Sequence, residues 1–232
     1  MKIGISGCSH SARYWGNPWH HYMGLRLNAE IVESWSPGAG NEMNFEKVKY
    51  ILGTHPDLDL FVFQVTEPAR LVVGLNDVDA SMIKEKISVD TTLPSEFSGS
   101  FYYTFNPDNN EDNLKRMLNK DIKVDNFIIK HSFISDYNLK FKVFHTILGL
   151  QQLCTLYGKK IIFFSWMIDL HKLAKSCGYY DLIKNLNITD GCVDDFVLKN
   201  NIERIPNDGH FNSINSERIY NEYIHDRILK FI

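Results

Sequence analysis

Hydrophobic positions in the first third of the chain form three short continuous runs, separated by stretches with helical spacing. The runs lie around Ile3 and Ile5, at 30–35 and at 59–65. The third run, DLFVFQV, is apolar along almost its whole length, which is typical of a strand buried on both faces of a parallel sheet. These runs predict three strands of one sheet.

Two helices are expected between these strands. Asn17 and Pro18 are typical of a helix start, with Asn as the N-cap and Pro at the first position. The second helix is expected to carry Phe45, Val48 and Leu52 toward the core. Strands and helices that alternate over about 60 residues predict parallel pairing and a three-layer α/β/α sandwich. The right-handed crossover rule then places the ends of the three strands on one edge of the sheet.

The second half of the chain continues this pattern after an interruption. Residues 78–126 are rich in Ser, Thr, Asn, Asp and Pro, with aromatic residues at 101–105, and they predict an irregular insertion. The insertion is interpreted either as a lid that faces the substrate or as a surface segment with its own small aromatic cluster. After it, the pattern predicts a helix at 135–157, a strand at 161–166 and a last helix beginning at Asn212 or Ser213.

Length and composition describe an ordinary folded domain. With 232 residues, of which 44% are hydrophobic and 23% charged, the chain predicts one domain at 1–232 with a sizeable core. The net charge of −3 gives no electrostatic reason to expect nucleic-acid binding. The sequence shows no signal peptide and no apolar run of about 20 residues, which predicts a cytoplasmic protein without a membrane span. The four cysteines lack paired spacing and are expected to be free thiols.

Residues that can carry chemistry first appear where the first strand ends. A small-residue break, Ser6-Gly7-Cys8-Ser9, follows the strand, and open α/β sheets bind ligands at that edge. Ser9 is therefore the candidate nucleophile. Cys8 is interpreted either as an alternative nucleophile or as a thiol buried beneath the turn. The segment matches neither the Gly-x-Ser-x-Gly nucleophile elbow nor a phosphate-binding or dinucleotide-binding fingerprint.

Three blocks of the sequence resemble a known family. Gly7-Cys8-Ser9, the PGAGN segment at 37–41 and Asp208-Gly209-His210 are similar in order and spacing to blocks I, II and V of the SGNH/GDSL hydrolases. The resemblance covers nearly the whole chain. It implies the flavodoxin-like SGNH hydrolase fold and a serine esterase or acetylhydrolase activity without a cofactor. Block III, usually Gly-x-Asn-Asp, is not matched, because Gln64-Val65-Thr66-Glu67 follows the corresponding strand.

A serine nucleophile needs a base, and the base needs a group that fixes its tautomer. His210 is the candidate base, since it lies in a Gly-containing loop just before a helix. Asp208 is the candidate orienting acid. The usual family spacing, Asp-x-x-His, would place the acid at Asn207, whereas a shorter Asp-x-His spacing occurs in some branches of the family and favours Asp208.

The oxyanion formed on attack needs two or three preorganised donors. The backbone N–H of Ser9 is one, and Gly40 resembles the block II glycine whose N–H is the second. Asn41, Gln64 and Thr66 are alternatives for the third. Side chains alternate along a strand, so we expect Thr66 to face Ser9 and Gln64 to support it from beneath.

An arginine and three histidines lie near these blocks in the sequence. Arg70 is interpreted either as a ligand for a substrate anion or as an ion-pair partner of Glu67. His10, His20 and His21 are not expected to form a metal site, because adjacent histidines on a helix point in different directions.

The leading functional hypothesis is a serine esterase or deacetylase that acts through an acyl-enzyme on a small acyl ester, with an O-acetylated carbohydrate as a candidate substrate. Trp15, Trp19 and Trp35 are interpreted as core and rim residues or as a sugar platform. One alternative is a binding module that has lost catalysis, which the missing block III suggests. Another is an acyltransferase that uses the same serine. Nothing in the sequence indicates the oligomeric state.

Overall fold

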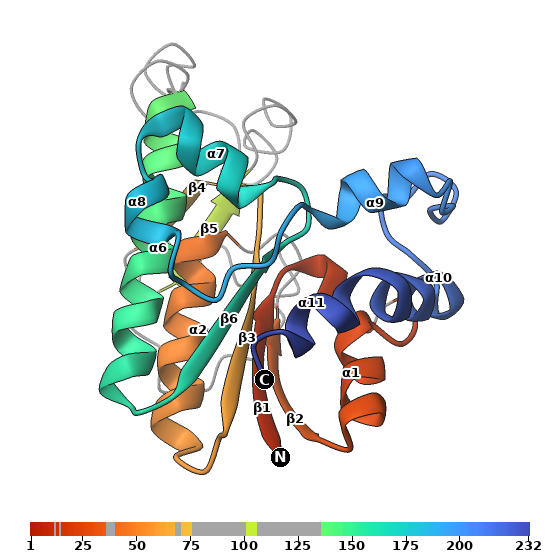
Figure 1. Ribbon diagram of the computed structural model, residues 1–232, viewed down its shortest axis with the longest axis horizontal. Helices are drawn as coiled ribbons and strands as arrows, with labels where there is room; N and C mark the ends of the chain where they lie inside the picture. Colours follow the sequence, from red (N-terminus) through yellow and green to blue (C-terminus); the bar gives the residue numbers. More distant parts are fainter. Residues whose placement is uncertain (12, 14, 36–39, 68–70, 76–100, 106–135) are drawn as a thin grey trace.

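A four-stranded parallel sheet forms the centre of the molecule (Figure 1). In this computed structural model the described residues are 1–11, 13, 15–35, 40–67, 71–75, 101–105 and 136–232. The strand order is β2–β1–β3–β6, with β1 at Lys2–Gly7, β2 at Glu30–Trp35, β3 at Leu60–Val65 and β6 at Lys160–Ser165. Each neighbouring pair is parallel. The four strands lie where the apolar runs predicted them.

The alternation of side chains along the strands divides the core into two halves. One face of the sheet carries Ile3, Ile5, Leu60, Val62, Ile162 and Phe164. The other face carries Phe61, Phe63, Val65, Ile161 and Phe163. Because both faces are apolar, the sheet needs a layer of helices on each side.

Helices cover both faces of the sheet (Figure 1). The first face packs against α1 (Trp19–Leu27), α9 (Val193–Lys199), α10 (Ser213–Ile219), the π-helical turn η5 (Tyr220–Ile224) and α11 (His225–Leu229). The second packs against α2 (Asn41–Thr54), α6 (Asp136–Leu156), α7 (Leu170–Cys177) and α8 (Tyr180–Ile183). The predicted three-layer α/β/α sandwich is confirmed. Within the described ranges, no helix is long and apolar enough to cross a bilayer.

The ends of two helical segments differ from the predicted ones. The first helix begins at Trp19, so Pro18 precedes it, and the backbone N–H of Asn17 donates instead to Ser213 Oγ at 2.9 Å. The last helix was predicted as one element, but it consists of α10, η5 and α11 in succession. Its N-cap is Asn212, whose side chain accepts from the Asn215 N–H at 2.9 Å. A single π turn barely changes the apolar spacing, so the sequence pattern does not show it.

Two further strands, β4 (Leu71–Leu75) and β5 (Phe101–Phe105), pair antiparallel as a separate sheet. β5 lies inside 78–126, for which the sequence predicted irregular structure, so that prediction is wrong for these 5 residues. The FYYTF segment has high strand propensity, which the polar residues around it concealed. The remainder of 78–126, and with it the interpretation as a lid or a surface segment, lies outside the described residues.

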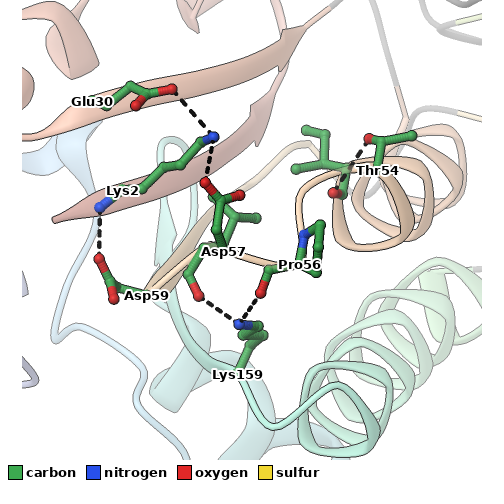
Figure 2. A network of polar contacts seen from close by, with 9 residues as sticks. Lys2, Glu30, Thr54, Pro56, Asp57, Asp59 and Lys159 are labelled. Atoms are coloured by element: carbon green, nitrogen blue, oxygen red, sulfur yellow. Dashed lines mark hydrogen bonds and ion pairs between the residues drawn. The ribbon is translucent and has the colours of Figure 1, made fainter.

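Lys2 joins three segments at the amino edge of the sheet (Figure 2). Its Nζ lies 2.9 Å from Asp57 Oδ2 and 3.3 Å from Glu30 Oε1. Its backbone N–H donates to Asp59 Oδ2 at 2.7 Å. The hydrogen bond to Asp57 raises the pKa of Lys2, so the ammonium stays charged across the physiological range.

Lys159 makes a second link at the same edge, from the residue before β6 (Figure 2). Its Nζ donates to the carbonyl oxygens of Pro56 and Leu58 at 2.6 and 2.7 Å. One charged side chain therefore satisfies two backbone acceptors in the connection between α2 and β3. The opposite, carboxyl edge of the sheet is the one that carries the candidate functional residues.

Candidate active site

The turn after β1 places Ser9 at the carboxyl edge of the sheet. β1 ends at Gly7, and Ser9–Ser11 form one 3₁₀ turn, η1. The Ser11 N–H donates to the Cys8 carbonyl oxygen at 2.9 Å. Ser9 is 7% exposed. This edge is where open α/β sheets bind ligands, and the structure places Ser9 there.

Buried polar contacts hold this turn from beneath. Gln64 on β3 accepts at Oε1 from the Ser11 hydroxyl at 2.6 Å and donates from Nε2 to Cys8 Sγ at 3.1 Å. Trp19 donates from Nε1 to Ser11 Oγ at 3.1 Å. A Cβ at Gly7 would lie 2.5 Å from both Gln64 Oε1 and Ser11 Oγ, so this close approach requires glycine. Gln64 supports the turn, and both ends of its amide are engaged in doing so.

The thiol of Cys8 is part of this buried layer. Cys8 is 2% exposed and, like the other three cysteines, unpaired. A thiol in this position is shielded from an incoming ester, in contrast to the hydroxyl of the next residue. The structure thus places Cys8 beneath the turn.

His20 on α1 contacts the same turn. The imidazole is fully buried, and its Nε2 lies 3.0 Å from the Ser11 carbonyl oxygen. Burial, followed by the charge of Arg13, lowers the pKa of His20 to about 3. The ring is therefore neutral at neutral pH and donates from one nitrogen alone, either from Nε2 to the Ser11 carbonyl oxygen or from Nδ1 to Glu33 Oε2, which lies 3.1 Å away. No cluster of three or more His, Cys, Asp or Glu side chains in the described part of the chain could hold a metal ion.

A tight turn places Asp208 and His210 just before α10. The Asp208 N–H donates to the Ile205 carbonyl oxygen at 2.9 Å, with Pro206 and Asn207 at the two central positions. Asn207 has a φ of 59°, the left-handed region that the second central position of a type II turn requires. The Ile205 N–H donates to the His210 carbonyl oxygen at 2.9 Å. Asn207 thus has a conformational role, and the carboxylate comes one residue later.

Asp208 and His210 form the acid–imidazole pair that a general base needs. The ring Nδ1 of His210 is hydrogen-bonded to Asp208 Oδ1, and the His210 backbone N–H donates to the same oxygen at 3.0 Å. The hydrogen bond from His210 lowers the pKa of Asp208, so the carboxylate is charged at neutral pH. With the Nδ1 proton donated to Asp208, Nε2 is an acceptor. Nε2 is buried and has no hydrogen-bond partner among the described residues.

Ser9 and His210 line the same cleft. Its other lining residues are His10, Trp15, Gly16, Asn17, Pro18, Trp166, Phe211 and Ser216. The cleft is narrow, with about 10 Å³ of space for the centre of a water-sized sphere, which is room for about one water molecule. His210 Nε2 is not hydrogen-bonded to Ser9, and catalytic hydrogen bonds commonly tighten only when substrate binds.

Aromatic rings surround the imidazole of His210. The indole of Trp15 stacks on it, with ring centroids 3.6 Å apart and planes 7° apart. The His10 ring lies 4.9 Å from His210, tilted by 44°, and stacks in turn on Trp166 at 4.2 Å and 6°. Sequence reasoning missed these contacts, because stacking between residues far apart in the chain leaves no local pattern.

The start of α2 is bonded to the end of β3. Gly40 is the buried N-cap of α2, and its carbonyl oxygen accepts from the Asn44 N–H at 3.1 Å. Asn41 Oδ1 accepts from the Thr66 N–H at 2.8 Å, and Asn41 Nδ2 donates to the Thr66 carbonyl oxygen at 3.3 Å. The Thr66 hydroxyl is buried and has no hydrogen-bond partner in the part of the chain that the structure describes. Of the three alternatives for the third oxyanion donor, the Thr66 hydroxyl is thus the one that makes no other bond.

Those predicted site residues that the structure describes therefore fall into two groups. Ser9 and His210 line one cleft, and Asp208 contacts His210. Apart from Ser9, the residues predicted for the oxyanion hole gather where α2 begins and β3 ends, and they are not among the residues that line the cleft. Arg70 lies outside the described residues, so its two interpretations stay predictions.

Solved structures share this fold. The chain resembles TesA with a TM-score of 0.55 at 8% identity, over 100% of each chain. It resembles a member of the lipolytic protein G-D-S-L family from Veillonella parvula DSM 2008 with a TM-score of 0.50 at 11% identity, over 99% of this chain and 97% of the other. The predicted SGNH hydrolase fold is confirmed, although identities this low establish no activity. No protein-family model and no curated protein matches the sequence.

Proposed function

We propose that this protein is a serine hydrolase that cleaves a small acyl ester, with Ser9 as the nucleophile, His210 as the base and Asp208 as the orienting acid. One observation carries the proposal. The imidazole of His210 is bound to Asp208 through Nδ1, has an unpartnered Nε2, and lines a cleft together with Ser9. In a Ser-His-Asp triad the acid binds Nδ1 of the imidazole, and Nε2 takes the proton of the serine hydroxyl. The fold shared with a lipolytic G-D-S-L protein supports the same assignment.

In the first half of the reaction, His210 Nε2 takes the hydroxyl proton of Ser9 as Oγ bonds to the ester carbonyl carbon. The carbonyl electron pair moves to oxygen and forms a tetrahedral oxyanion. When the oxyanion collapses, the bond to the alkoxide oxygen breaks, and His210 gives its proton to that oxygen. The alcohol leaves and the acyl group remains on Ser9.

Water completes the second half of the reaction. It loses a proton to His210 as its oxygen attacks the acyl carbon, and a second oxyanion forms. Collapse breaks the bond to Ser9 Oγ, which recovers the proton from His210, and the carboxylic acid is released. Asp208 stays charged throughout and stabilises the imidazolium formed in each half.

The backbone N–H groups of Ser9 and Gly40 are the proposed oxyanion donors, and the Thr66 hydroxyl is the proposed third. Gly40 opens α2, so the positive end of the helix dipole favours negative charge beside it. Thr66 supports the proposal because its buried hydroxyl has no bond to give up when an oxyanion forms.

The proposed substrate class is an ester of a small acyl group, such as an O-acetylated carbohydrate. The narrowness of the cleft favours a small acyl group such as acetyl over a long acyl chain. Trp15, Trp166 and Phe211 also line the cleft, and amphipathic aromatic rings suit the rim of a site for a polar ligand.

Active-site labelling and turnover test this function together. A fluorophosphonate probe should label Ser9, and p-nitrophenyl acetate should produce an acetylated protein that intact-mass analysis detects. Ser9→Ala should lower kcat by several orders of magnitude while leaving thermal unfolding nearly unchanged. Ser216→Ala removes another serine of the same cleft and should keep the activity. Labelling at another residue, or equal turnover by Ser9→Ala, would contradict the assignment.

A binding module without catalysis is the second candidate. It is favoured by the absence of a hydrogen bond at His210 Nε2 and by the engagement of the Asn41 and Gln64 amides in structural bonds. The same experiment separates the two, since a binding module would neither react with the probe nor accumulate an acyl-enzyme. An acyltransferase would form the acyl-enzyme but release it faster to an added alcohol than to water.

A further inference from the structure

We propose that Trp15 is a positioning residue for the imidazole of His210, holding the plane of the ring and stabilising its protonated form. The proposal rests on the proposed function of His210 as the base. Trp15 belongs neither to the triad nor to the oxyanion hole. One of the two tests below measures fluorescence and does not require catalytic activity.

The stacking geometry is the first support. The ring centroids of Trp15 and His210 are 3.6 Å apart and the planes differ by 7°, so the indole lies flat against the imidazole. The Nδ1 of the same imidazole is held by Asp208. The hydrogen bond fixes one edge of the ring and the indole fixes its plane. Rotation of the imidazole away from this plane would break both contacts.

The second support is that Trp15 also acts on Asp208. After His210, which has the largest effect, the Trp15 side chain also contributes to the lowered pKa of the Asp208 carboxylate. One indole therefore acts on both members of the acid–imidazole pair. A residue that merely filled space at the rim of the cleft would not need both contacts.

The charge that develops in the reaction gives the stack its chemical effect. When His210 accepts the proton of Ser9, the ring becomes a cation against the face of an indole, and the indole is the aromatic side chain that attracts cations most strongly. The other titratable groups at this ring are Asp208, which favours the cation, and His10, which lies 4.9 Å away. Because the cation exists only after proton transfer, the stack lowers the barrier and not the binding energy of the substrate.

The backbone around Trp15 is held independently of its indole. Gly16 has a φ of 118°, and a Cβ there would lie 2.2 Å from Ser213 Oγ. That hydroxyl accepts from the Asn17 N–H at 2.9 Å, which ties the loop to the start of α10. Replacement of Trp15 is therefore expected to leave the loop in place, so that its effect can be assigned to the side chain.

Kinetics of two Trp15 variants test the effect on catalysis. Trp15→Leu should lower kcat about tenfold, the size expected of one partly desolvated cation–π contact, with KM on p-nitrophenyl acetate nearly unchanged. Trp15→Phe keeps a ring over His210 and should recover most of this loss. Tyr180→Leu, at a half-exposed ring on α8, is the matched control and should change neither constant. A rise in KM with kcat unchanged, or equal losses in the Leu and Phe variants, would overturn the proposal.

Fluorescence tests the stack without turnover. A protonated imidazole against an indole quenches its emission, so emission that Trp15→Phe removes should fall as the pH is lowered and the imidazole takes up its second proton. The same difference, measured in a His210→Ala background, should show no such fall. His10 and Trp166 are present in both members of each pair, so their contribution cancels. Quenching that persists without His210 would overturn the proposal, whereas quenching that depends on His210 in a protein without hydrolase activity would contradict only the proposed function.

Discussion

At the scale of single residues, the turn at 205–208 gives Asn207 and Asp208 different roles: Asn207 adopts the left-handed turn conformation, and Asp208 binds the imidazole of His210. Asp208→Asn should lower kcat by about 10²–10⁴-fold, because an amide in place of the carboxylate favours the wrong imidazole tautomer. Asn207→Gly should keep the activity, since glycine adopts a φ of 59° without strain. Steady-state kinetics on p-nitrophenyl acetate compares the two. If Asn207→Gly were the more damaging change, the assignment of Asp208 as the orienting acid would be wrong.

The pH dependence of stability gives a second test of Asp208. Its partners, first among them His210, lower its folded-state pKa below the usual value near 3.8. A carboxyl group with a depressed pKa contributes stability that is fully present above its unfolded pKa and is lost as the pH falls through its folded pKa. The difference in unfolding free energy between the wild type and Asp208→Asn should therefore be constant near neutral pH and shrink below about pH 4. A difference that grows in acid would contradict the sign of the shift.

What the sequence reveals at this scale depends on how local the signal is. Ser9 follows a strand end and His210 precedes a helix, and both positions could be inferred from the motifs. The left-handed φ of Asn207 was encoded as well, in a Pro-Asn pair typical of a type II turn. The stack of Trp15 on His210 could not be inferred from the sequence, because it depends on how the loop before His210 packs against the loop before α1.

At the scale of elements, one side chain bonds α2 to the end of β3. Asn41→Ala would leave the N–H and carbonyl of Thr66 without their buried partners, which should destabilise the protein by about 1–3 kcal/mol. Thr66→Val keeps the shape, removes an unpartnered buried hydroxyl and should not destabilise. If that hydroxyl is the third oxyanion donor, Thr66→Val should lower kcat by about 10²-fold with KM unchanged.

Chemical denaturation and steady-state kinetics on both variants measure these effects. A Thr66→Val protein with full kcat would show that the hole does without this hydroxyl. A stable but inactive Asn41→Ala protein would instead assign the third donor to Asn41, against the bonds that its amide makes in the structure.

Elements were predictable where one periodicity dominates. The strands of the central sheet are buried on both faces, so continuous apolar runs mark them clearly. β5 escaped prediction because its five residues stand among polar and turn-forming neighbours. The π-helical turn η5 escaped because one additional residue per turn hardly alters a hydrophobic stripe.

At the scale of the whole molecule, the two edges of the sheet have different tasks. The carboxyl edge carries Ser9, the start of α2 and the end of β3, while the amino edge carries the links made by Lys2 and Lys159 (Figure 2). The layered architecture followed from the order of apolar runs, because parallel strands joined by helices permit few arrangements. The shape of the cleft could not be predicted from the sequence in this way, because the side chains that line it come from four separate segments of the chain.

This division predicts that stability and catalysis can be changed separately. Lys159→Met keeps the aliphatic stem but removes the ammonium from the carbonyl oxygens of Pro56 and Leu58. Hydrogen bonds to charged groups contribute about 1.5–3 kcal/mol, so a loss of about 2 kcal/mol is expected. For a chain of this length the midpoint of thermal unfolding should fall by roughly 2–4 °C per kcal/mol. The kcat should be unchanged, because the link lies at the edge of the sheet opposite Ser9.

The neighbouring Lys160 supplies the matched control. It is exposed at the start of β6, and Lys160→Met should change the unfolding free energy by no more than about 0.5 kcal/mol. Calorimetry gives the two midpoints, and p-nitrophenyl acetate turnover below the unfolding transition gives the two rates. Equal midpoints for both variants would show that the carbonyl oxygens are satisfied equally well by water. A lower kcat in Lys159→Met at a temperature where it is fully folded would show that the amino edge also shapes the cleft, and the two tasks would then not be separable.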